Sequence, residues 1–187
     1  MNKPSARGER PTEELHGIWQ HLVYEIQMCF EAGKMLSTFK PNEVRDEDRV
    51  IHNALIESFT IHARSLVAFL YPEDPRPDDV TGDDFFDDPS VWRKIRPTKT
   101  KALENAHPRV AKEVAHLTYA RIVITEEQRR WPFPRIAADL GLALREFVRL
   151  LPDDFIKPLA IRESTSPPPI PPEGGPITEA GSKGLGG

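Results

Sequence analysis

Apolar residues recur along this chain at three- and four-residue spacings, which is the pattern of amphipathic helices. Over residues 13–39 the repeating positions are Leu15, Ile18, Trp19, Leu22, Ile26 and Phe30. Thr12 precedes this stretch, and threonine is a favoured N-cap residue. Pro41 follows the stretch and ends it, because proline cannot continue a helix. The pattern therefore predicts a long first helix over residues 13–39.

A second apolar stripe runs through residues 46–71, which contain no glycine or proline and end before Pro72. At about 100° per residue, one stripe collects Ile51, Leu55, Phe59, Leu66 and Leu70. His62 falls inside this stripe. Because an unpartnered buried polar group costs about 1–3 kcal/mol, His62 needs a hydrogen bond. We expect it either to bond another helix or to support a functional site from behind.

Two further helical regions follow, over residues 100–124 and 135–151. Pro108 either interrupts the third region or begins a new helix, because proline is favoured at a first helical position. The apolar face of the last helix holds Ile136, Leu140, Leu144, Phe147 and Leu151. Since no segment shows the alternation of a strand, the chain predicts an all-α antiparallel bundle of four to five helices.

A long acidic loop, residues 73–88, crosses between the second and third helical regions. It carries eight acidic residues against one arginine, and a basic run over residues 93–101 follows it. We expect Phe85 and Phe86 to pin this loop to the core and the basic run to neutralise part of its charge. A calcium site is disfavoured because the alternating ligands and central glycine of an EF-hand loop are missing.

The composition fits one helical domain over residues 12–162, between a flexible N-terminus (1–11) and a disordered Pro/Gly-rich tail (163–187). The net charge of −4 gives no bulk attraction to nucleic acid. The single cysteine, Cys29, excludes a disulfide framework and a cysteine-based zinc site. Because no secretory signal or membrane-length apolar stretch occurs, we expect a cytoplasmic protein without a membrane partner.

The strongest candidate chemistry lies in the third helical region. Arg109 stands seven residues before His116, so on one helix the two side chains would lie about 20° apart. A histidine can act as acid or base near neutral pH, and an arginine can hold a phosphate with two parallel hydrogen bonds. We predict these two as catalytic residues for RNA cleavage. Residues within about 80° of them could assist in substrate binding, namely Asn105, Lys112 and Tyr119.

A structural alternative stays open for the same residues. Arg109 could instead pair with Glu113 one turn further on. His116 would then be a boundary residue bonded to a neighbouring carbonyl or carboxylate. In that case this region would form an interface and not a catalytic site.

The Arg109-x6-His116 pattern, together with the segments 57–66 and 113–118, resembles the HEPN superfamily. It looks most like the uncharacterised bacterial HEPN-like proteins near the abortive-infection group, and the resemblance covers residues 12–151. It implies a homodimer in which Arg109 and His116 form a composite site. It also implies a metal-independent endoribonuclease of toxin or defence type, with RNA and an antitoxin or other protein as partners. The alternative within the same superfamily is a noncatalytic dimerisation or partner-binding module.

A metal-binding helical bundle is a third and less favoured function. The chain has six histidines, but no pair of them has the i, i+3 or i, i+4 spacing of ligands on one helix. We therefore expect neither a metal nor another cofactor.

Overall fold

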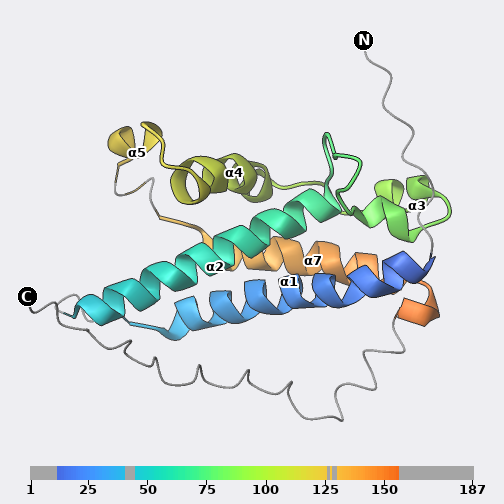
Figure 1. Ribbon diagram of the computed structural model, residues 1–187, viewed down its shortest axis with the longest axis horizontal. Coiled ribbons are helices and arrows are strands. Elements are labelled where there is room, and N and C mark those ends of the chain that lie inside the picture. The colour runs from blue at the N-terminus through green and yellow to red at the C-terminus, as the bar shows by residue number, and fades with distance from the viewer. Residues whose placement is uncertain (1–11, 41–44, 126, 128–129, 156–187) are drawn as a thin grey trace, which may run out of the picture.

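The computed structural model describes residues 12–40, 45–125, 127 and 130–155. Every regular element within these residues is helical, as the sequence predicts, and no strand occurs among them (Figure 1). Within the same residues, no helix combines the length and apolarity needed to cross a membrane. The predictions for residues 1–11, for 163–187 and for the end of the domain at 156–162 lie outside the described residues.

Three long helices lie side by side: α1 (Thr12–Thr38), α2 (Asp46–Leu70) and α7 (Phe133–Leu150). Helix α1 runs in the opposite direction to α2 and α7 (Figure 1). The bounds of all three agree with the predicted stretches to within two residues at each end. This agreement follows from the uninterrupted three- and four-residue periodicity of their apolar positions.

The core forms where the apolar stripes of these helices meet. Phe59 and Leu66 of α2 and Leu140 and Phe147 of α7 are fully buried. Each such side chain contributes about 1.5–3 kcal/mol through removal of its surface from water. Ile51 departs from the predicted stripe and is 45% exposed, because the first turns of α2 extend beyond the start of α7 (Figure 1).

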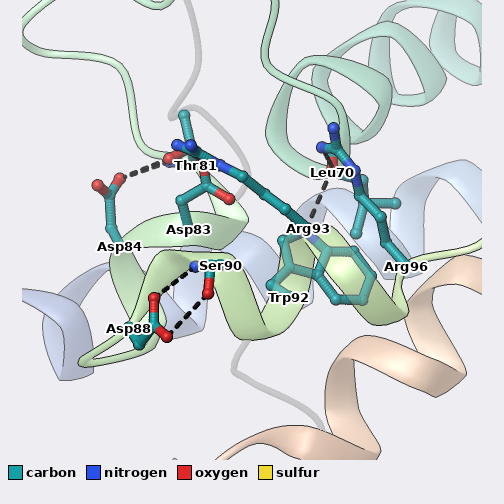
Figure 2. Close-up of polar contacts among 9 residues, drawn as sticks. All are labelled: Leu70, Thr81, Asp83, Asp84, Asp88, Ser90, Trp92, Arg93 and Arg96. Carbon is teal, nitrogen blue, oxygen red and sulfur yellow. Dashed lines mark hydrogen bonds and ion pairs between the residues drawn. The ribbon is translucent and has the colours of Figure 1, made fainter.

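The acidic loop is held by its own carboxylates. Figure 2 shows Asp84 bonded to Thr81 before the 3-10 turn η1 (Gly82–Phe85). Asp83 accepts a 2.6 Å hydrogen bond from Arg93, which confirms that the basic run neutralises part of the loop. Asp88 caps α3 (Pro89–Ile95) by accepting from the backbone N–H of Ser90 at 2.9 Å. Helix α3 is not predicted by periodicity, since it spans barely two turns.

Aromatic residues anchor this loop to the bundle. Phe85 is buried, as predicted, with its ring 5.6 Å from that of Phe147. Trp92 is fully buried, and its indole N–H donates to the carbonyl of Leu70 at 3.3 Å. Arg96 donates to the same carbonyl at 3.0 Å (Figure 2). The last turn of α2 is therefore capped by residues from beyond the acidic loop.

The third helical region, predicted over residues 100–124 with a possible break at Pro108, is instead broken after Ala115. Helix α4 (Lys101–Val110) passes into a π-helical turn, η2 (Ala111–Ala115). The chain becomes extended at His116, with φ −123° and ψ 143°, and a short helix, α5 (Ala120–Val123), follows. Pro108 lies inside α4, so it neither interrupts this region nor begins a new helix, and the prediction of one helix from Arg109 to His116 is wrong.

Side chains beyond the break explain why the helix ends there. The Thr118 hydroxyl donates to the carbonyl of Lys112 at 2.7 Å. The Arg121 guanidinium donates to the carbonyl of Val114 at 3.0 Å. These carbonyls would accept backbone N–H groups in a continued helix, and the side-chain donors satisfy them in its place. The π-turn itself is closed by the N–H of His116 on the carbonyl of Ala111 at 3.1 Å.

Candidate functional site

The guanidinium of Arg109 is half-buried and contacts Glu113 and Trp131. Its Nε and one terminal nitrogen each donate to a carboxylate oxygen of Glu113 at 2.8 Å. Its carbon Cζ lies 4.1 Å from the centre of the Trp131 ring, a cation–π contact. The alternative in which Arg109 pairs with Glu113 is thus the arrangement observed. The two donors that would hold a phosphate are occupied by a carboxylate of the same chain.

His116 does not share a helix face with Arg109. It is exposed and stands in extended backbone directly after the π-turn. The spacing of about 20° requires an unbroken α-helix between the two residues. The predicted one-face arrangement is therefore wrong, although a catalytic role for either residue remains a prediction.

The predicted assisting residues are dispersed over three elements. Asn105 is exposed on α4 and Lys112 is exposed on the π-turn. Tyr119 is 90% exposed immediately before α5. The break after Ala115 separates Tyr119 from the helix that carries Asn105.

His62 bonds to another helix, as one of its two predicted interpretations requires. Its Nδ1 lies 2.9 Å from Oε2 of Glu25 on α1. Its ring also makes an edge contact with Tyr24, at a centroid distance of 5.7 Å. These contacts place His62 at the α1–α2 seam, and its supporting role behind Arg109 and His116 stays a prediction.

A cleft of about 350 Å³ lies beside the Arg109–Glu113 pair. Asn53, Ile56 and Glu57 of α2 form one wall. The opposite wall combines the π-turn, α5 and the segment before α7, with Glu113, Val114, Arg121, Ile124 and Trp131. Arg121 closes this side through its bond to the Val114 carbonyl, and so fixes the position of α5.

Four large apolar side chains that are close in the sequence are exposed just beyond the π-turn. Leu117 is 93%, Tyr119 90%, Ile122 76% and Val123 77% exposed. We call these four residues the α5 patch. Monomeric proteins seldom expose contiguous apolar surface of more than a few hundred Å², and such surfaces mark interaction sites. In Figure 1, α5 stands away from the three long helices.

The described residues contain no group of three or more histidine, cysteine or acidic side chains placed to hold a metal ion. Of the three residues that matter most at this site, the sequence pattern indicates Glu113 but neither Arg121 nor Trp131. The i, i+4 spacing of Arg109 and Glu113 indicates their contact. No local signal indicates that Trp131, which lies 22 residues beyond Arg109, returns to cover its guanidinium.

In comparisons with known proteins, the chain matches no model of a protein family, no curated protein and no solved structure.

Proposed function

We propose that the chain is a helical self-association module in which the α5 patch contacts a second copy. The observation that carries the proposal is the exposure of four large apolar side chains within seven residues, each at least 76% accessible. Withdrawing them from water provides a driving force for association. In this proposal the helices form an antiparallel bundle, which is the scaffold that presents the α5 patch.

A second copy is the occupant that the chemistry favours. The four side chains of the α5 patch carry no charge. Arg121, the cation between them on α5, is half-buried and bonded to the Val114 carbonyl, so it adds little repulsion between two copies. Exposed groups of both signs, Lys112 and Glu127, flank it along the chain. In a two-fold contact the same patch serves both partners, and flanking groups of opposite sign can pair across the axis. A homodimer is also what the HEPN resemblance implies.

Sedimentation velocity over a range of concentrations tests this proposal. We expect the wild type to form a dimer with a dissociation constant on the order of micromolar, because four side chains make an interface below standard size. Ile122→Glu should sediment as a monomer, since it places a charge in the apolar contact. Leu142→Glu is the matched control, because Leu142 is 50% exposed on α7 and outside the patch. A monomeric wild type, or a dimer that Ile122→Glu leaves intact, contradicts the proposal.

A metal-independent endoribonuclease is the second candidate, and the π-turn favours it. Single π-helical turns occur frequently at functional sites, and here the turn presents Lys112 and His116 to solvent. His116 would act as acid or base, while Arg109 would exchange Glu113 for a phosphate. The HEPN resemblance implies the same two roles.

RNA cleavage in EDTA by the wild type and by His116→Ala tests this second candidate. His21→Ala is a suitable control, because His21 is an exposed histidine on α1. The ribonuclease proposal expects His116→Ala to lose activity and His21→Ala to retain it. Absence of cleavage by the wild type, or equal cleavage by all three proteins, contradicts it.

A further inference from the structure

A second and larger groove lies on the other side of α4, away from α5. Its volume is about 610 Å³. Ile61, Arg64 and Ala68 of α2 line one side, and the first part of the acidic loop lines another. Lys99 and His107 complete the groove before and within α4. In Figure 1 this loop rises between α3 and α4.

Positive groups converge on this groove. Arg64 is half-buried, and its guanidinium has no hydrogen bond or ion pair among the described residues. The side chain of Lys99 is 17% exposed, with its ammonium 2.7 Å from Glu73. His107 stands close enough to both that their charges act on its imidazole. Arg76 is a further cation, exposed on the loop side.

Three carboxylates line the groove, and hydrogen bonds within the protein already engage two of them. Glu73 is 81% exposed and already bonded to Lys99. Asp79 accepts the backbone N–H of Arg76 at 2.7 Å. Asp74 is exposed on the loop. A half-buried arginine therefore faces a groove in which two of the three carboxylates already accept a hydrogen bond, Glu73 from Lys99 and Asp79 from the backbone of Arg76.

We propose that Arg64, Lys99 and His107 bind the phosphate group of a small phosphomonoester in this groove. A guanidinium supplies two parallel donors to phosphate oxygens, and a lysine adds a mobile point charge. Glu73 holds Lys99 in the free protein, and the phosphate either displaces Glu73 from Lys99 or binds Lys99 beside it. This site is separate from the α5 patch, so it does not depend on self-association.

The rest of the ligand would lie along the apolar part of the groove. Ile61, Ala68 and Val80 supply this surface, and the volume falls within the range of sites for small organic molecules. A phosphate alone would leave most of that surface in contact with water. The groove therefore fits a phosphate ester better than the free anion.

The imidazole resonances of His107 provide a direct probe, assigned by comparison with His107→Gln. Inorganic phosphate and phenyl phosphate are titrated separately, each against chloride at equal ionic strength to remove general screening. We expect both to shift the His107 signals saturably, with phenyl phosphate binding at least as tightly. Arg64→Gln should weaken binding by about tenfold or more, because it removes a charged bidentate donor. The affinity of Arg64→Lys should lie between that of the wild type and that of Arg64→Gln.

Arg49→Gln is the matched control, since Arg49 lies on the first turn of the same helix, paired with Asp46. It should bind as the wild type does. Unchanged thermal unfolding of Arg64→Gln establishes that its loss is local. No saturable shift, or equal binding by wild type and Arg64→Gln, overturns the site. Binding of inorganic phosphate with exclusion of phenyl phosphate overturns the ester and leaves a site for the free anion only.

Discussion

Arg109 holds both oxygens of the Glu113 carboxylate, through two hydrogen bonds of 2.8 Å. The pair is half-buried, with 24% of the arginine side chain and 16% of the glutamate side chain exposed. Trp131 covers the guanidinium from one side. The arginine that the sequence offers for phosphate binding therefore holds the π-turn in this structure, and its phosphate role stays a prediction. The exposed surface just beyond that turn becomes the stronger functional candidate.

Removing this arginine should destabilise the protein. Arg109→Ala deletes a charge-assisted pair and a cation–π contact, and it leaves Glu113 largely buried without its partner. We expect the free energy of unfolding to fall by about 2 kcal/mol. Urea denaturation followed by circular dichroism measures this change.

Arg149→Ala provides the comparison for that experiment. Arg149 also pairs with an acid on its own helix, Glu146, but the two side chains are 60% and 39% exposed. Such exposed pairs contribute about 0–1 kcal/mol. Equal losses in the two variants would show that the burial of the Arg109 pair contributes nothing.

His107 should give a pH dependence below neutrality. Burial, followed by the charges of Arg64 and Lys99, lowers its pKa below the usual 6.5, while Glu73 acts in the opposite direction. As pH falls through the usual value, the unfolded chain takes up this proton before the folded one does. The contribution of neutral His107 to the free energy of unfolding is therefore complete above the usual pKa of 6.5 and declines as the pH falls below it. His107→Gln should show a weaker decline between about pH 7 and pH 5, and a titration of His107 at or above the usual pKa would contradict the prediction.

Cys29 should resist thiol reagents in the folded protein. It is fully buried, and burial, reinforced by the charge of Glu25, raises its pKa to about 12. Since the thiolate is the reactive form, we expect labelling only on unfolding. Val50→Cys, at a position 64% exposed, should add one fast-reacting thiol. Rapid labelling of the wild type without denaturant would show that Cys29 is accessible.

Trp92 should contribute mainly through packing. It is fully buried, with its ring 5.3 Å from that of Phe147. Trp92→Ala should lower the free energy of unfolding by about 3–5 kcal/mol. Trp92→Phe should cost about 1 kcal/mol, because the Leu70 carbonyl keeps its bond to Arg96. Thermal unfolding of both variants measures the difference, and similar losses would assign the main contribution to the indole N–H.

The sequence is sufficient to predict the long helices because their apolar positions repeat over many turns. It fails at residues 111–124 because contacts further along the chain end the helix there. Thr118 and Arg121 satisfy the carbonyls of the π-turn, and neither residue breaks the apolar periodicity. A helical wheel assumes regular geometry, so it could not place His116 once that geometry changed.

The candidate site is predictable to a similar extent. The Arg109–Glu113 pair follows from an i, i+4 spacing and is found in the structure. The α5 patch does not follow, because Leu117 fits the apolar side of a continued helix and is 93% exposed once the helix ends. The groove proposed for a phosphate ester joins α2, the acidic loop and α4. Its composition depends on tertiary packing and not on any local motif.

The distance between two α5 patches in solution tests the central claim most directly. Spin labels at Tyr119→Cys and, separately, at Leu142→Cys report distances between copies by pulsed dipolar spectroscopy, with native Cys29 buried and unlabelled. The account predicts a defined distance between the Tyr119 labels that is shorter than the distance between the Leu142 labels. Absence of dipolar coupling between copies, or closer approach of the Leu142 labels, would contradict it.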